Sequence, residues 1–238
     1  MSGFGGESYT RAMPAAMSYG SRRPRVVAHT AVSLEGATTG FTPDVGLFYE
    51  LASTWHEDIT LAGADTILAQ EQALATAPRP GPAEHGPLLA VVDGRGRVRQ
   101  WEALREVGHW SDVVALYAGS TPARPAASAV PELVTGTERV DLAEALDVLG
   151  RREGAEVVRV DSGGSLTGAL LRAGLLDEVS LLVHPCLAGS AARHYWYGPG
   201  AHPGGALELV GSEALGDGVV WLRYRLARRG SASRSWPG

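Results

Sequence analysis

The sequence predicts an α/β protein with three layers (α/β/α). A mostly parallel central sheet is expected between two layers of helices, with a C-terminal antiparallel hairpin. Short apolar runs rich in β-branched residues alternate with stretches whose apolar residues recur at helical spacing. That alternation is typical of parallel strands joined by helices that cover both faces of the sheet. Near the C-terminus, two strand-like runs flank Gly216-Asp217-Gly218, which indicates a hairpin and therefore antiparallel edge strands.

The first third of the chain predicts two strands and two helices. A strand is expected over residues 26–34, which are mostly apolar and follow Pro24. Asp44 is suited to cap a helix, because the apolar residues after it share one face: Val45, Phe48, Leu51, Ala52 and Trp55. Residues 58–62 predict a second strand, and a turn over 63–66 leads into a helix over 67–74.

The remaining chain repeats this alternation and adds the hairpin. Helices are expected over residues 101–107, over 142–149 after a cap at Asp141, and from residue 165 onward. Strands are expected over residues 88–92, 112–117, 132–134, 157–160, 178–184, 207–213 and 219–226. The proline-rich stretch 75–87 is too short for a domain linker and is interpreted as a surface loop.

The pattern predicts a single domain over residues 24–227, between a flexible tail at 1–23 and a second tail at 228–238. Cys186 is the sole cysteine, which excludes an internal disulfide and a cysteine-rich metal site and suits a cytoplasmic protein. No run approaches the roughly 20 apolar residues that a membrane span needs. The N-terminal stretch has no continuous apolar segment, so a secretory signal is not expected.

The charge is distributed unevenly along the chain. All 21 basic residues are arginines, and residues 1–25 and 225–238 hold eight of them. Residues 26–224 carry 13 arginines and 25 acidic residues, a net charge of −12. An acidic body argues against nucleic acid as a partner, because nucleic-acid binding needs cations that neutralise phosphates. An anionic ligand would need local arginines or the N-terminus of a helix.

The most informative stretch is the glycine turn that follows the expected strand 157–160. Asp161-Ser162-Gly163-Gly164 separates that strand from a helix start, and the first amides of a helix attract anions such as phosphate. Two interpretations are open at this point: a phosphate site, or a plain turn whose helix is capped by Ser162 or Ser165. The turn at 63–66 is a second candidate anion site. The loop 93–97 also follows a strand, and ligands of such sheets bind at these strand ends.

These motifs, taken together and in order, resemble the reductase domain of the bifunctional riboflavin-biosynthesis deaminase/reductase, within the dihydrofolate-reductase-like superfamily. The matching stretches are AVSLEG (31–36), LAGADTILA (61–69), VDSGGSL (160–166), AGLLDE (173–178) and the Pro185–Gly189 segment. They span residues 24 to about 224. The zinc ligands of the deaminase domain are not present in this sequence. The resemblance implies a reductase domain over 24–227, a small-molecule substrate and a homodimer.

The resemblance also implies that NADPH is the cofactor. Residues 163–169 match the family's pyrophosphate turn, and Thr66 and Ala31 match further contacts, the latter near the nicotinamide. Arg95 and Arg97 follow the strand after which members of the family bind the 2′-phosphate of the cofactor. The alternative is that both are solvated arginines of a surface loop. The Gly163–Gly164 peptide is hypothesised to be cis. The predicted cofactor residues are Ala31, Gly63, Thr66, Gly94, Arg95, Arg97, Ser162, Gly163, Gly164, Ser165, Leu166 and Thr167.

The substrate half departs from the family pattern. Where the family has a glutamate at the start of the glycine turn, this chain has Asp161, and where the family has a lysine before the S-L-D-G motif, this chain has His29. Ala77 stands in place of an arginine that contacts the substrate in the family. The ribose-phosphate site is therefore interpreted as partly lost, and the substrate need not be the riboflavin intermediate. The predicted substrate contacts are Asp161, Ser33 and Leu74.

The implied chemistry is hydride transfer from NADPH to an imine or a related small heterocycle, for which the protein supplies orientation and a proton. Asp161, His29 and Glu35 are the predicted catalytic residues, and no metal site is expected. Each has a structural alternative: a helix-cap acid for Asp161, a satisfied buried histidine for His29 and a turn residue for Glu35. The alternative function is a non-catalytic nicotinamide- or flavin-binding protein of the same fold.

Overall fold

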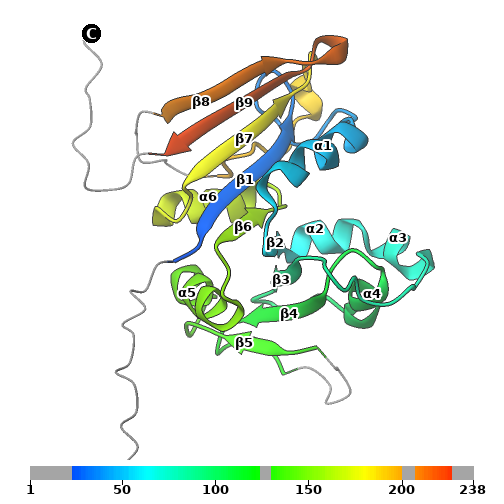
Figure 1. Ribbon diagram of the computed structural model, residues 1–238, viewed down its shortest axis with the longest axis vertical. Coiled ribbons are helices and arrows are strands. Elements are labelled where there is room, and N and C mark those ends of the chain that lie inside the picture. The colour runs from blue at the N-terminus through cyan, green and yellow to red at the C-terminus, as the bar shows by residue number, and fades with distance from the viewer. Residues whose placement is uncertain (1–22, 124–129, 200–206, 227–238) are drawn as a thin grey trace, which may run out of the picture.

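The computed structural model describes residues 23–123, 130–199 and 207–226. In these residues nine strands form a single sheet with the order β5-β4-β3-β2-β6-β1-β7-β9-β8 (Figure 1). The pairs from β5 to β7 are parallel, whereas β7 pairs with β9, and β9 with β8, in antiparallel fashion. The predicted mostly parallel sheet with a C-terminal hairpin is therefore confirmed. Apart from Arg23, the predicted tails at 1–23 and 228–238 lie outside the described residues.

The strands begin and end close to their predicted positions. The first strand ends at Val32, two residues earlier than expected, because the Ser33 amide donates to the Ala37 carbonyl and closes a turn. The strands are β1 Arg25–Val32, β2 Ile59–Gly63, β3 Leu88–Val92, β4 Asp112–Tyr117, β5 Glu132–Val134, β6 Val157–Val160, β7 Glu178–Val183, β8 Leu207–Ala214 and β9 Val220–Leu226.

The helices follow the predicted caps but differ in length. Asp44 Oδ1 accepts from the Leu47 amide, and Asp141 accepts from two amides of the first turn, so both predicted N-caps are confirmed. The single helix expected over 67–74 is two short helices that meet at Gln70. The helices are α1 Val45–Ala52, α2 Ala64–Ala69, α3 Glu71–Thr76, α4 Trp101–Glu106, α5 Leu142–Glu153 and α6 Gly164–Ala173.

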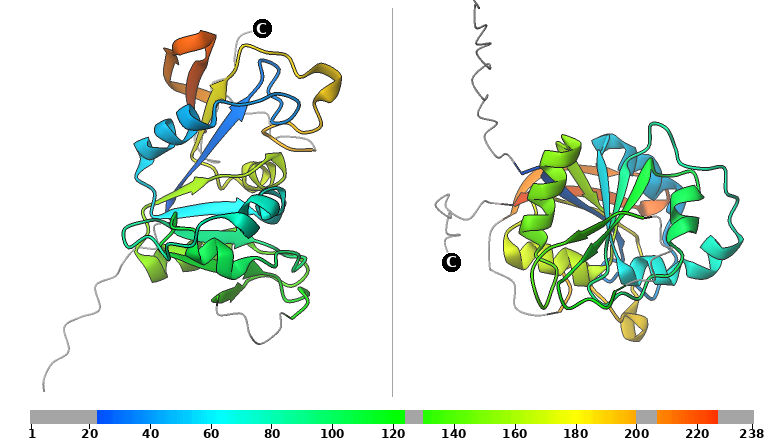
Figure 2. Two further views of the ribbon diagram at one scale, coloured as in Figure 1. Left: turned by 90° about the vertical axis from the view of Figure 1, so that its right-hand side faces the viewer. Right: turned by 90° about the horizontal axis from the view of Figure 1, so that it is seen from below.

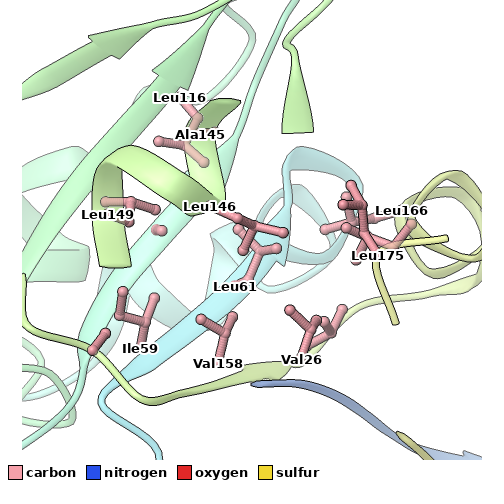
Figure 3. Close-up of a cluster of buried hydrophobic side chains, with 14 of the residues drawn as sticks. Val26, Ile59, Leu61, Leu116, Ala145, Leu146, Leu149, Val158, Leu166 and Leu175 are labelled. Carbon is pink, nitrogen blue, oxygen red and sulfur yellow. The ribbon is translucent and has the colours of Figure 1, made fainter. Parts of the chain in front are cut away.

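Helices cover both faces of the sheet, as the predicted three-layer α/β/α architecture requires. Helices α5 and α6 lie on one face, and α2, α3 and α4 lie on the other (Figure 2). Leu146 of α5 and Leu166 of α6 pack with Leu61 and Val158 of the sheet in one buried cluster (Figure 3). A second cluster joins Leu74 and the helices of the opposite face to β3 and β4. Burial of these side chains at roughly 25 cal/mol per Å² of apolar surface is the main stabilising contribution.

The parallel pairing places the carboxyl ends of β1, β2, β3 and β6 at a common edge. The Asp161 amide, just after β6, donates to the Leu61 carbonyl of β2, so the two strands stay paired to the end of β6. Ligands of sheets of this kind bind at such an edge. No helix in the described ranges is long and apolar enough to cross a membrane.

Candidate active site

A cleft of about 500 Å³ lies at the edge of the sheet where β1 and β6 end. The last residues of β1, from His29 to Ala31, line it together with the turn 161–165 that leads from β6 into α6. Other walls come from the loop before α1, from Phe48 on α1, from α2, and from His194. The fold therefore brings the predicted pyrophosphate turn and the predicted nicotinamide contact to the same cleft.

Helix α6 begins at this cleft without a side-chain cap. Gly163 is its N-cap residue, and no side chain accepts a hydrogen bond from the first helical amides. The alternative in which Ser162 or Ser165 caps the helix is therefore wrong. Ser162 Oγ instead accepts from the Gly63 amide at 3.2 Å and lies at the same distance from Thr66 Oγ1, which joins the turns after β6 and β2. The start of this ten-residue helix thus remains suited to an anion.

The two adjacent glycines of the turn have different surroundings. A side chain at Gly163 would meet no atom within 4 Å, and this residue is exposed to the cleft. A Cβ at Gly164 would lie 1.8 Å from the Tyr195 carbonyl oxygen and 2.7 Å from the Gly198 amide nitrogen. Gly164 is therefore needed for close approach of the protein's own segment 195–198. The hypothesis of a cis bond between the two glycines is wrong, because no cis peptide occurs in the described chain.

Some of the predicted cofactor residues in the two turns are buried, and the others line the cleft. Leu166 is a core residue, and Thr167 is fully buried with its hydroxyl donating to the Ser162 carbonyl at 3.4 Å, so neither side chain reaches the cleft. Gly63 is buried against Ser162, where a Cβ would lie 2.9 Å from the hydroxyl oxygen. The residues that do line the cleft are Ala31, Thr66, Ser162, Gly163, Gly164 and Ser165.

The loop after β3 brings one of the two predicted arginines toward the cleft. The buried Asp93 carboxylate accepts from the amides of Arg97 and Val98 at 3.0 and 2.8 Å and fixes the loop. Arg97 Nη2 donates to Oδ1 of Asp65, a cleft-lining residue, at 2.7 Å, and Arg97 Nε is buried without a hydrogen-bond partner. Gly94 and Arg95 do not line the cleft, and the Arg95 side chain is exposed.

Asp161 enters the cleft from a network of charged and polar groups. The buried Arg159, two residues earlier on β6, places Nη1 3.3 Å from Asp161 Oδ2 and donates from Nε to Glu57 Oε1 at 2.7 Å. Tyr49 of α1 also contacts Asp161; burial and this carboxylate, which accepts a hydrogen bond from the phenol, raise the pKa of Tyr49. Asp161 is thus held by neighbours from β6 and α1, not by the first turn of α6.

His29 is hydrogen-bonded at both ring nitrogens. Nε2 donates to the Phe48 carbonyl at 3.0 Å, so Nδ1 accepts from Ser180 Oγ at 2.9 Å, and that hydroxyl accepts from Trp221 Nε1 at 2.7 Å. Burial lowers the pKa of His29 to about 4, and the positive charge of Arg159 acts in the same direction. The ring is therefore neutral at pH 7 and tethered, which supports the structural alternative for His29 over a role as proton donor.

Three predicted site residues lie away from the cleft. Glu35 Oε1 accepts from the Gly189 amide at 2.7 Å, and this bond lowers the pKa of the Glu35 carboxyl and ties the turn to the following segment. Ser33 is fully buried, and its hydroxyl accepts from the Ala37 amide. Leu74 is a core residue on α3. None of the three lines the cleft, so the roles predicted for them are not supported by the geometry.

Several cleft residues carried no signal in the sequence. The loop before α1 contributes Thr38, Thr39 and Phe41, and the end of α2 contributes Gln70. Thr39 Oγ1 accepts from the Arg193 and His194 amides, so this wall forms only when two segments 154 residues apart meet. Such residues have no motif of their own, and the fold alone identifies them.

Fold and site together define an α/β protein with a ligand cleft at the carboxyl edge of a mostly parallel sheet. The protein belongs to the family described as the RibD C-terminal domain, whose model matches residues 24–221. The predicted α/β fold, with a mostly parallel sheet between helical layers and a C-terminal antiparallel hairpin, is confirmed.

Relatives with curated names are reductases. The chain is 27% identical over 212 residues to the 2,5-diamino-6-ribosylamino-4(3H)-pyrimidinone 5′-phosphate reductase of Methanothermobacter thermautotrophicus, covering 83% of this chain and 96% of that protein. It is 26% identical over 184 residues to the reductase of the same name from Archaeoglobus fulgidus, covering 70% and 83%.

Solved structures agree on the fold. A riboflavin biosynthesis reductase of Saccharomyces cerevisiae superimposes with a TM-score of 0.64 at 20% identity, covering 86% of this chain and 90% of that one. A pyrimidine reductase-like protein of Corynebacterium diphtheriae superimposes with a TM-score of 0.66 at 16% identity, covering 90% and 96%.

Proposed function

We propose that this protein is an NADPH-dependent reductase that transfers hydride to an imine or a related group of a small pyrimidine-like heterocycle. The observation that carries the proposal is the uncapped start of α6, which opens at Gly163 into the same cleft as Asp161. The relatives named above, which reduce a ribosylaminopyrimidinone phosphate, support the reaction class.

The residues present fit a phosphorylated dinucleotide. Gly163 leaves space for a pyrophosphate to approach the backbone, and the first amides of α6 can donate to it. The buried Nε of Arg97 lacks a partner, and its guanidinium lies beside Asp65 of the cleft, where a 2′-phosphate could accept from it. Ala31 and Thr66 would hold the nicotinamide and the adjoining ribose or phosphate. NADPH bound here supplies the hydride.

On the substrate side, Asp161 is the residue best placed to act. Its carboxylate, held by Arg159, can accept hydrogen bonds from amino groups of a heterocycle. A phenol is protonated at neutral pH, and the Tyr49 pKa is raised further, so a proton lies on Tyr49 Oη beside the Asp161 carboxylate. Phe41 and Phe48 line the same cleft and would exclude water from a bound ring.

Titration of the purified protein with NADPH and NADH, followed by fluorescence, tests the cofactor half. NADPH oxidation with pyrimidine, pterin and flavin acceptors tests the reaction, and Asp161→Asn should reduce turnover without a change in NADPH affinity. Tight NADPH binding without oxidation by any acceptor would support the non-catalytic alternative. An absence of binding to both nucleotides would refute the proposal.

We also propose a homodimer in the cytoplasm. Strand β8 is the edge of the sheet, and its apolar residues Leu207, Leu209 and Val210 are exposed. An exposed apolar edge strand favours pairing with another chain. Light scattering after size exclusion would test this, and Leu209→Lys should shift the protein toward the monomer if β8 forms the interface.

A further inference from the structure

A buried arginine lies in the middle of the sheet, next to the cleft. Arg159 belongs to β6, the strand between β2 and β1 (Figure 1), and its side chain is only 6% exposed. Its neighbours Val158 and Val160 pack in the cluster that contains α5 and α6. Because side chains alternate along a strand, Arg159 points to the opposite face of the sheet. A permanent positive charge is therefore placed where proteins usually bury an apolar side chain.

Two carboxylates bind this arginine at different nitrogens. Nε donates to Glu57 Oε1 at 2.7 Å, and Nη1 donates to Asp161 Oδ2 at 3.3 Å. Thr60, the partner of Arg159 across β2 and β6, donates to the same Glu57 oxygen at 3.5 Å. A guanidinium is planar and rigid, so an anchor on Nε also fixes the position of Nη1. Glu57 therefore sets where the Asp161 carboxylate meets its partner.

The two carboxylates belong to different edges of the sheet. Asp161 lines the cleft at the carboxyl ends of the strands. Glu57 is absent from that lining and instead lines a second cleft of about 550 Å³, at the edge where β2 and β3 begin. Arg159 thus connects a residue outside the candidate active site with a residue inside it. A substitution at Glu57 changes no direct contact of a ligand in the active cleft.

Stability alone does not account for a charged group at this place. Moving charges into the interior costs free energy, and apolar side chains of similar volume often stabilise a protein as well as a buried ion pair does. Here one buried guanidinium serves two carboxylates whose side chains are 11% and 24% exposed. The more exposed of the two belongs to Asp161, the residue that the proposed function places against the substrate. The arrangement therefore favours a role in orienting that carboxylate.

We propose that Arg159 and Glu57 are positioning residues for the reduction: Glu57 anchors Arg159, and Arg159 holds the Asp161 carboxylate in the orientation that the substrate meets. The inference rests on the proposed function and adds two residues to it that do not line the cleft. A displacement of about 1 Å in a group that acts on the substrate can reduce the rate on the order of 100-fold. A rigid partner for Asp161 is therefore expected to matter.

The central test removes the anchor. Glu57→Leu leaves Arg159 paired with Asp161 but frees the guanidinium to turn. We expect kcat/KM for 2,5-diamino-6-ribosylamino-4(3H)-pyrimidinone 5′-phosphate to fall about tenfold, whereas the Kd of NADPH in fluorescence titration stays unchanged. Glu57→Gln retains an oxygen that accepts from Nε and should keep most of kcat/KM. Crystal structures of both variants should show the Asp161 carboxylate turned in the first and unmoved in the second.

Two arginine variants separate positioning from loss of stability. Arg159→Lys keeps the charge but loses the planar fork that binds two carboxylates, so kcat/KM should again fall about tenfold. Arg23→Lys is the matched control, because Arg23 binds both oxygens of Asp177 at 2.9 and 3.1 Å and does not line the cleft. It should lower the melting temperature and leave kcat/KM unchanged. Thermal denaturation of each sample records the stability.

Either of two results for Glu57→Leu would overturn the inference: an unchanged kcat/KM, or an Asp161 carboxylate that stays in place. If this variant does not fold, the same two measurements on Arg159→Lys decide. Failure of the wild type to bind NADPH or to reduce any acceptor refutes the proposed function instead. The orientation of Asp161 in the crystal structures then decides the positioning role alone.

Discussion

The turn after β6 and the turn after β1 occupy comparable positions in the sheet. Only the turn after β6 opens into the cleft. Both follow buried parallel strands, and both contain glycine at the carboxyl edge of the sheet. The turn after β6 presents Gly163 to open space. The turn after β1 is closed: Ser33 accepts from the Ala37 amide, Glu35 accepts from Gly189, and Gly36 faces Trp196.

The segment after β7 causes this difference. It lies against the turn after β1, where the Trp196 amide donates to the Gly36 carbonyl, and it also reaches Gly164 at the start of α6. One segment therefore fills the first turn completely and the second turn in part. A glycine turn at the end of a strand indicates that another group approaches the backbone closely. The rest of the structure determines whether that group is a ligand or another segment of the protein.

The largest effect is expected from Gly164→Val. The added side chain would overlap the Tyr195 carbonyl and displace segment 195–198, so we expect destabilisation of more than about 3 kcal/mol. NADPH binding should be lost together with the native fold of this region. Thermal denaturation checks it, and an unchanged melting temperature would contradict the packing described here.

Gly163→Val provides the matched comparison at the neighbouring position. Its side chain would meet no protein atom, so the cost to stability should not exceed about 1 kcal/mol, from a poorer N-cap. NADPH binding should weaken by more than roughly tenfold, since the valine occupies the space that a pyrophosphate needs. Nucleotide titration and thermal denaturation of the same sample separate the two effects; wild-type affinity would refute the role of this turn.

The loop that contains Arg95 and Arg97 predicts a smaller effect, on the choice between NADPH and NADH. Arg97→Ala should reduce the preference for NADPH over NADH by about tenfold, because its guanidinium lies beside a cleft residue. Arg95→Ala serves as the control and should leave the preference nearly unchanged. Titration with both nucleotides measures this, and a preference that survives in the Arg97 variant would place the 2′-phosphate elsewhere.

The smallest effect is expected at the closed turn. Because the Gly189 amide lowers the pKa of Glu35 in the folded protein, the carboxylate stabilises the fold above its unfolded pKa, and this contribution is lost as the pH falls through the folded pKa. Glu35→Gln should therefore lower the melting temperature slightly at about pH 7, and the difference should shrink as the pH falls through the lowered pKa of Glu35. Turnover should be retained. A large loss of kcat at an unchanged melting temperature would restore the catalytic role predicted for Glu35.

The fold was largely predictable because its determinants are local. Apolar runs give β3 and β4 their positions, and Asp44 and Asp141 mark the starts of two helices. The site was less predictable because burial and partners depend on distant residues. Leu74 was predicted to contact the substrate but faces the core, and the neutral, tethered state of His29 is set by Phe48, Ser180 and Trp221.

The order of strands in the sheet also determines when each strand can pair during synthesis. Strands β2, β3, β4 and β5 are consecutive in the chain and adjacent in the sheet, so they can pair as they leave the ribosome. Strand β1 is synthesised first, yet both its neighbours, β6 and β7, lie within residues 157–183. Its apolar stretch must stay unpaired until β6 is made, when about two thirds of the chain exists, which makes it the segment most exposed to misassociation during synthesis.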